Sequence, residues 1–152
     1  MLRQILLWAS ANDFLSDRLP RIAFVKNAAS KFMPGETLGD ALEAAVVLKQ
    51  EKITSVFTLL GESVADSDEA KEVVAHYKTV LIQAKDRGLI SEISLKLTQI
   101  GIDLGQELAQ ENLENIVEFA ESLGLFVWVD IEGSDYTDIT LEIYKRAIAK
   151  YS

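Results

Sequence analysis

The chain has 152 residues, of which 49% are hydrophobic and 26% are charged, the composition of one globular domain with a buried core. The absence of cysteine and the single histidine, His76, exclude thiol catalysis, disulfide cross-linking and the usual zinc sites. The formal charge of −9, with no basic stripe along the sequence, argues against a nucleic-acid partner.

Basic residues collect at the start of the chain. Residues 1–31 hold five lysines and arginines against two aspartates, a formal charge of +3, so the remainder carries −12. The apolar run at the beginning is too short for a membrane span and has no clear signal-peptide cleavage site, so we expect a cytoplasmic protein. We expect the N-terminal helices to pack on their own domain or a neighbour, and peripheral contact with the inner membrane is the alternative.

The first elements in chain order are helical. Residues 1–33 are predicted to form short helices, which the Pro-Gly pair at 34–35 ends. Thr37 is a suitable N-cap for a helix over residues 38–52, with Asp40 placed three residues later to complete the cap. After this helix the pattern of hydrophobic residues changes.

Strands and helices alternate three times after this point. The predicted strands are 54–62, 93–101 and 125–133, and the helices that follow them are 67–87, 105–123 and 136–151. Gly88 and Gly124 follow the first two of these helices, at the position that lets a helix stop and the chain enter a strand. This alternation predicts an α/β fold with a parallel sheet.

Two parallel architectures fit this order, an open doubly wound sheet and a (β/α)8 barrel. A nucleotide-binding open sheet would carry a glycine-rich turn after its first strand, and only Gly61 is found there. A barrel gathers inward polar residues where its strands end, and this pattern is present. Taken as every second residue, the three sets are Thr58, Leu60 and Glu62; Ser94, Lys96 and Thr98; and Trp128, Asp130 and Glu132.

Lys96 is the most unusual residue of these sets, because Leu95 and Leu97 flank it in an apolar strand. A buried ammonium group without a partner is costly, so we expect Asp130 or Glu132 on the neighbouring strand to pair with it. Such a pair either fixes the register of the sheet or belongs to an active site.

Four segments resemble the bacterial monofunctional proline dehydrogenase family, flavoenzymes with a (β/α)8 barrel. They are FMPGETLGDALEAA, LLGESVADSDEA, ISLKLTQIGIDLGQELAQENLENIV and FVWVDIEGSDYTDITLEIY. The specific part is the pair SLKLTQIG and VDIEGSDYT, which places a lysine in the second barrel strand and an aspartate at the end of the third. Thr58 departs from the family, which often has an acidic residue at that position.

The resemblance implies oxidation of L-proline to Δ1-pyrroline-5-carboxylate, with electrons passing to FAD and then to a membrane quinone. Pyrroline-5-carboxylate dehydrogenase is a partner that it also implies. Carried over by residue, Lys96 is expected to bind the proline carboxylate, Asp130 to be the catalytic acid, and the backbone of Val129 to approach FAD.

The resemblance covers the N-terminal half of the family's enzymes. A complete barrel takes about 250 residues; here residues 53–152 are interpreted as its first three β-α units, preceded by an N-terminal helical segment at residues 1–52. Three strands leave open edges, so we expect an inactive truncated chain that associates, as a homo-oligomer or with another segment. Two alternatives stay open, a non-catalytic interaction or oligomerising module and another barrel enzyme that acts on a small carboxylate without flavin.

Overall fold

The computed structural model describes residues 37–61 and 63–151. The helices predicted within residues 1–33 and the side chain of Glu62 therefore lie outside the described residues. The chain divides into two compact units after Ala44, and the second unit, Ala45–Ser152, carries all three strands. The domain boundary predicted at residue 52 stays a prediction.

Helix α4, Leu38–Gln50, begins with the cap that the sequence predicts. The backbone N–H of Asp40 donates to Thr37 Oγ1 at 3.2 Å, and the Thr37 N–H donates back to Asp40 Oδ2 at 3.1 Å. These reciprocal bonds satisfy two backbone donors at the helix start. After α4 the chain turns through Lys52, whose φ of 62° is in the left-handed region.

A three-stranded parallel sheet follows, in the order β1-β2-β3. Its middle strand, β2, aligns Ser94 with Thr58 of β1 and Lys96 with Asp130 of β3. The α/β class with a parallel sheet is therefore confirmed. The elements are β1 Ser55–Thr58, α5 Ser67–Asp86, β2 Ser91–Lys96, the 3-10 helix η2 Leu97–Ile100, α6 Gln106–Leu123, β3 Val127–Asp130 and α7 Ser134–Lys150.

The turns between helices and strands confirm one prediction and correct another. Gly88 and Gly124 have φ of 66° and 70°, the left-handed conformation expected after α5 and α6. The predicted strands 54–62, 93–101 and 125–133 all run past the observed ends at Thr58, Lys96 and Asp130, and β2 begins earlier, at Ser91. After Lys96 the chain leaves the sheet and enters η2, which ends at Gly101 with φ of 99°. Thr98 therefore lies on η2 and not on a strand.

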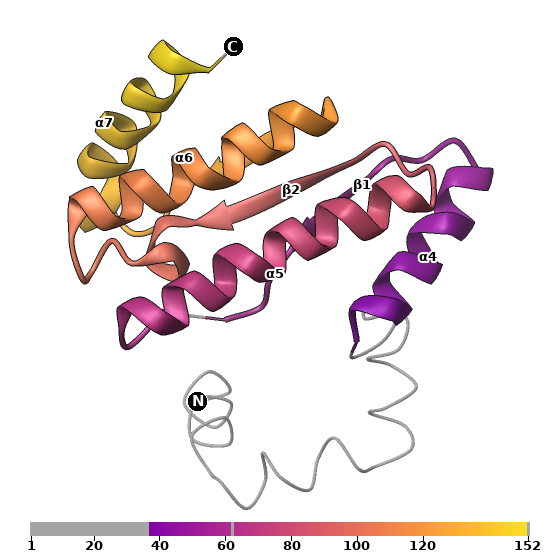
Figure 1. The fold of residues 1–152 in the computed structure, drawn as a ribbon, viewed down its shortest axis with the longest axis horizontal. Helices are drawn as coiled ribbons and strands as arrows, with labels where there is room; N and C mark the ends of the chain where they lie inside the picture. The colour runs from indigo at the N-terminus through magenta and orange to yellow at the C-terminus, as the bar shows by residue number, and fades with distance from the viewer. Residues whose placement is uncertain (1–36, 62, 152) are drawn as a thin grey trace, which may run out of the picture. The chain divides into compact units, whose positions relative to one another are not determined.

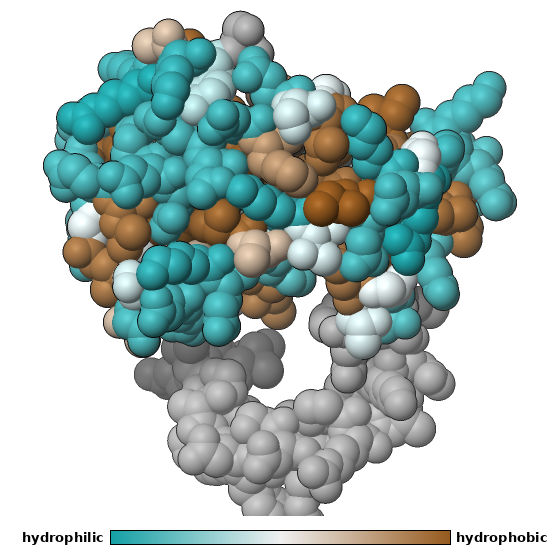
Figure 2. All heavy atoms as spheres, in the orientation of Figure 1, coloured by the Kyte–Doolittle hydropathy of each residue, from teal (hydrophilic) through white to brown (hydrophobic). Residues whose placement is uncertain are grey.

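Helices α5 and α6 lie side by side across one face of the sheet (Figure 1). Strand β2 turns Ile93 and Leu95 toward them, and both side chains are fully buried. The helices contribute the rest of this core, with Val74, Tyr77, Leu81, Leu113 and Ile116. On the outer side, hydrophilic residues cover most of the surface shown in Figure 2. No helix of the described residues is long and apolar enough to cross a membrane.

The opposite face of the sheet has no helix over it in the described part of the chain. Val56 of β1 and Trp128 of β3 are 54% and 50% exposed there. Trp128 Nε1 donates to Glu92 Oε2 at 2.6 Å, across the β2–β3 pair. The sheet thus has one apolar, covered face and one mixed, open face, and Trp128 fills no core among these residues.

A buried polar contact closes the carboxyl end of the sheet. The hydroxyl of Tyr77 lies 3.1 Å from both Gln99 Oε1 and the carbonyl oxygen of Ser94, and it accepts the N–H of Leu59 at 3.2 Å. The amide of Gln99, 1% exposed, donates to the carbonyls of Leu59 and Gly61 at 2.8 and 3.2 Å. We call Tyr77 and Gln99 the polar clamp, because together they join α5, the end of β1 and η2.

Replacing Tyr77 by Phe removes the hydroxyl and leaves buried partners unsatisfied. We expect Tyr77→Phe to lower the free energy of unfolding by about 1–3 kcal/mol. Urea unfolding followed by circular dichroism measures this loss. Tyr144→Phe, at a tyrosine that is 44% exposed on α7, is the matched control and should change stability little. Equal stability of the two variants would contradict the role given to the clamp.

Burial raises the pKa of the Tyr77 phenol above its ordinary value of 10.0, partly opposed by the N–H of Leu59. The neutral phenol is therefore favoured in the folded state. Its contribution to stability should be complete below about pH 10 and should be lost as the pH rises toward the pKa of the folded state. Unfolding free energies measured from pH 9 to 12 for the wild type and Tyr77→Phe should converge, and parallel curves would contradict this.

Candidate active site

Polar side chains from two strands meet at the carboxyl edge of the open face. Lys96, the last residue of β2, and Asp130, the last residue of β3, are aligned across the parallel pair, so their side chains leave the sheet on the same face. Both are partly exposed, as is Ser94 on β2. The predicted site residues Lys96 and Asp130 are therefore brought together.

Both carboxylates at this edge accept hydrogen bonds from β2 or η2. Ser94 Oγ donates to Asp130 Oδ1, and Thr98 Oγ1 donates to Glu132 Oε1 at 2.7 Å. The backbone N–H of Thr98 also donates to Glu132 Oε2, at 3.2 Å. Hydrogen bonds to a charged acceptor are stronger than neutral ones, so these contacts hold the carboxylates in fixed positions.

The expected ion pair of Lys96 is not formed within residues 37–61 and 63–151. Neither Asp130 nor Glu132 lies within ion-pair distance of its ammonium group. The prediction assumes a fully buried lysine, but Lys96 lies on the open face and is partly exposed. The cost that would have demanded a carboxylate partner is therefore absent, and the ammonium group is available to a ligand.

The side chain of Val129 takes the opposite direction from those of Lys96 and Asp130. It lies in a groove of about 500 Å³ between β3, α6 and α7, which we call the apolar groove. Its lining includes Leu113, Val117, Val127, Val129, Tyr144 and Ile148. Only the backbone of Val129 is thus left to meet a ligand on the open face.

The end of β1 contributes less to the candidate site than the sequence predicts from Thr58, Leu60 and Glu62. Thr58 is the last residue of the strand and is exposed, and Leu60 lies beyond it with 90% exposure. Glu62 lies outside the described residues. In the chain segments that the structure describes, the charged edge is therefore built by β2, β3 and the residues after them.

Tyr136, in the first turn of α7, connects this helix to the segment between η2 and α6, because its hydroxyl donates to Asp103 Oδ1 at 2.8 Å. The neighbouring carboxylate of Asp103 raises the pKa of the Tyr136 phenol, chiefly through this hydrogen bond. His76 lies on α5, where its ring contacts Tyr77 edge to face, in agreement with a packing role. No cluster of possible metal ligands is found among the described residues.

The polar clamp is the supporting feature that the sequence sets missed. Tyr77 shares the apolar face of α5 with Val74 and Leu81, so a hydroxyl on a buried helical face was a usable signal. The sequence carries no such signal for Gln99, because its burial depends on a 3-10 helix where the sequence predicts a strand.

Taken together, the fold and this edge define an α/β protein whose parallel strands carry an unpaired ammonium group and a fixed carboxylate at their carboxyl ends. Residues 41–152 match the family description "Proline dehydrogenase". The chain belongs to the proline dehydrogenase family, and the resemblance drawn from its motifs is confirmed.

Similar proteins include bacterial proline dehydrogenases. The chain is 32% identical over 146 residues to proline dehydrogenase 1 of Bacillus subtilis, covering 96% of this chain and 48% of that protein. It is 28% identical over 149 residues to proline dehydrogenase 2 of the same organism, covering 98% and 49%. The Deinococcus radiodurans proline dehydrogenase is 26% identical over 128 residues, which cover 82% of this chain and 41% of that protein. The chain thus spans about half the length of these relatives.

The fold resembles a solved structure, proline utilization A from Bdellovibrio bacteriovorus inactivated by N-propargylglycine. The two share a TM-score of 0.72 at 21% identity, over 83% of this chain and 16% of that one. This likeness supports the fold.

Thr98 and Thr140 allow a matched test of the Glu132 contact. Both are buried, but Thr98 bonds Glu132 while the hydroxyl of Thr140 has no partner among the described residues. We expect Thr98→Val to lower the free energy of unfolding by about 1–3 kcal/mol, because it removes a hydrogen bond to a carboxylate. Thr140→Val should be neutral or stabilising. Urea unfolding compares them, and the reverse order would contradict the contact.

Proposed function

We propose that this chain provides the N-terminal half of an FAD-dependent proline dehydrogenase, which oxidises L-proline to Δ1-pyrroline-5-carboxylate and passes the electrons to a quinone. The family membership supports the activity. The chain covers about half of the length of its relatives, which supports the proposal that it is half of the enzyme. The observation that carries the proposal is the alignment of Lys96 with Asp130 on the open face.

The charges at this edge suit a zwitterionic substrate. Proline carries one carboxylate and one ammonium group, and the two aligned strands offer one charge of each sign. Lys96 has no competing carboxylate partner in the described residues, so it can bind the substrate carboxylate through a charge-assisted hydrogen bond. The carboxyl group of Asp130, which accepts a hydrogen bond from Ser94, lies at a fixed place on the neighbouring strand. Lys96 is thus the proposed substrate-binding residue and Asp130 the proposed catalytic residue.

The three strands are proposed to be the first strands of a (β/α)8 barrel. In such a barrel the helices cover the outside and the inward face carries the site at the carboxyl ends. The covered and open faces of this sheet fit that division. Strand β3 is an edge strand in the described residues, and the apolar groove beside it leaves room for a further strand and its side chains.

The described residues fit one wall of a flavin site. The open face presents the aromatic ring of Trp128 next to Asp130, and Val129 can offer only its backbone there. FAD, when bound, would supply the oxidant that accepts two electrons from the substrate. Lys96 and Asp130 would orient the substrate against it.

Further parts of the proposal rest on the family alone. These are a cytoplasmic enzyme with peripheral contact to the inner membrane, pyrroline-5-carboxylate dehydrogenase as a partner, and a homo-oligomer. One other function is favoured by a specific observation: the unpaired edge of β3 and the apolar groove suit an interaction or oligomerising module.

The test compares the 152-residue chain with the product of its complete gene, by flavin absorbance and proline-dependent dye reduction. We expect the complete product to bind flavin and reduce the dye. In it, Lys96→Ala should raise KM for proline about 10- to 100-fold with a smaller change in kcat, because it removes a charge-assisted hydrogen bond. Lys145→Ala, at an exposed lysine on α7, should leave both constants unchanged.

The outcomes separate the proposals. A complete product that stays without flavin and inert toward proline contradicts the dehydrogenase activity. A loss of kcat in Asp130→Asn with little change in KM supports the catalytic role of Asp130. If the complete product is inert yet associates through the β3 edge, the interaction module is the better description.

A further inference from the structure

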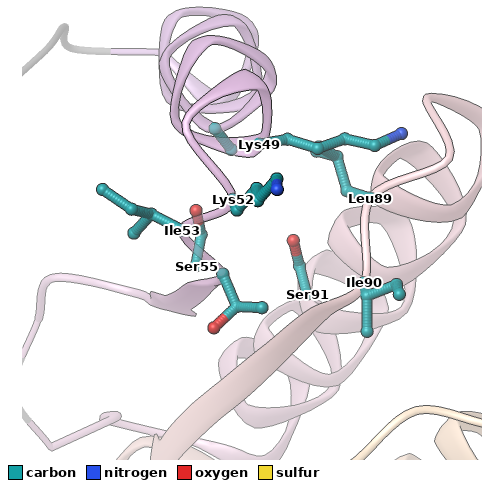
Figure 3. A pocket seen from close by; sticks show the side chains of 9 residues that line it. Lys49, Lys52, Ile53, Ser55, Leu89, Ile90 and Ser91 are labelled. Carbon is teal, nitrogen blue, oxygen red and sulfur yellow. The ribbon is translucent and has the colours of Figure 1, made fainter.

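A cavity with two lysines in its lining lies at the opposite end of the sheet from Lys96 and Asp130. It has a volume of about 180 Å³ and is enclosed by the end of α4, the turn into β1 and the turn into β2 (Figure 3). Its polar lining consists of Lys49, Lys52, Ser55 and Ser91, and Ile53, Leu89 and Ile90 form apolar walls.

The hydroxyls of this cavity are placed by the register of the sheet. Ser55 and Ser91 are the first residues of β1 and β2 and are aligned with each other, so their side chains leave the sheet side by side. Ser91 is 2% exposed, and its hydroxyl makes no hydrogen bond with any described residue although it lines the cavity. Because this hydroxyl opens onto the cavity, it can donate a hydrogen bond to a group bound there.

The two lysines supply positive charge from one side. Lys49 Nζ donates to the carbonyl oxygen of Gly88 at 2.8 Å, which fixes its ammonium group at the rim. Lys52 follows in the turn with φ of 62°, and in Figure 3 its side chain ends over the space into which Ser91 points. Neither lysine has a carboxylate within 4.0 Å among the described residues.

Of the residues that the structure describes, no acidic one lines this cavity, although the chain holds 24 acidic against 15 basic residues. Two ammonium groups at a cavity whose described lining has no carboxylate raise the positive potential there.

We propose that this cavity binds a small oxyanion, a carboxylate or a phosphate. Lys49 and Lys52 would supply the charge, and the hydroxyls of Ser55 and Ser91 would donate hydrogen bonds to its oxygens. The bound anion would join α4 to the amino ends of β1 and β2, and would therefore stabilise this end of the domain. The proposal does not depend on the dehydrogenase activity.

The test is the melting temperature of the chain in sodium phosphate and in sodium acetate, each against sodium chloride at equal ionic strength. For a protein of this size, about a tenfold excess of anion over its Kd should raise the melting temperature by about 3–6 °C, with saturation. A rise in phosphate alone or in acetate alone identifies which oxyanion the cavity prefers.

Variants separate a site from a general salt effect. Lys52→Gln and Ser91→Ala should each abolish the saturable rise, whereas Lys52→Arg should retain it because the charge remains. Lys145→Gln, at an exposed lysine on α7 away from the cavity, should behave as the wild type. Circular dichroism checks that each variant folds, and isothermal titration calorimetry with inorganic phosphate or acetate measures binding directly. An equal rise in chloride, or a full rise in Lys52→Gln, would overturn the proposal.

Discussion

Strand β2 lies between two parallel neighbours, and the alternation of its side chains determines both the core and the charged edge. Ile93 and Leu95 are fully buried beneath α5 and α6, while Ser94 and Lys96 lie on the other face. A shift of one residue in its register would exchange these faces and place an ammonium group in the core. The polar clamp opposes such a shift, because Tyr77 and Gln99 bind backbone groups of both β1 and β2.

Much of this arrangement could be predicted from the sequence. The helices α5 and α6, their terminal glycines and the cap of α4 follow from local signals, and the structure has them within a few residues of the predicted positions. The placement of Lys96 and Asp130 on the same face of the sheet can also be predicted, because side chains alternate between faces along each strand and the two strands are neighbours. The roles of Lys96, Asp130 and Val129 stay predictions.

Other features depend on three-dimensional context that no local pattern carries. The turn after Lys96 looks like a strand by its apolar alternation, but burial of Gln99 against the end of β1 bends it into a 3-10 helix. The sequence predicts a carboxylate partner for Lys96 because it predicts burial of this residue. On the open face Lys96 is partly exposed, so it needs no such partner. Ser91 is the first residue of a strand, and nothing in the sequence shows that it is buried at a cavity.

The position of Trp128 has a consequence for how this domain can be observed. The chain has two tryptophans, and Trp8 lies outside the described residues. The indole of Trp128 is half exposed on the open face, donates to Glu92 and contacts the ring of Phe126 with centroids 5.0 Å apart. Its fluorescence emission is therefore sensitive to water at the candidate site. A protein segment, a flavin or another copy of the chain that covers this face would shift or quench that emission, so the fold contains its own optical reporter of occupancy.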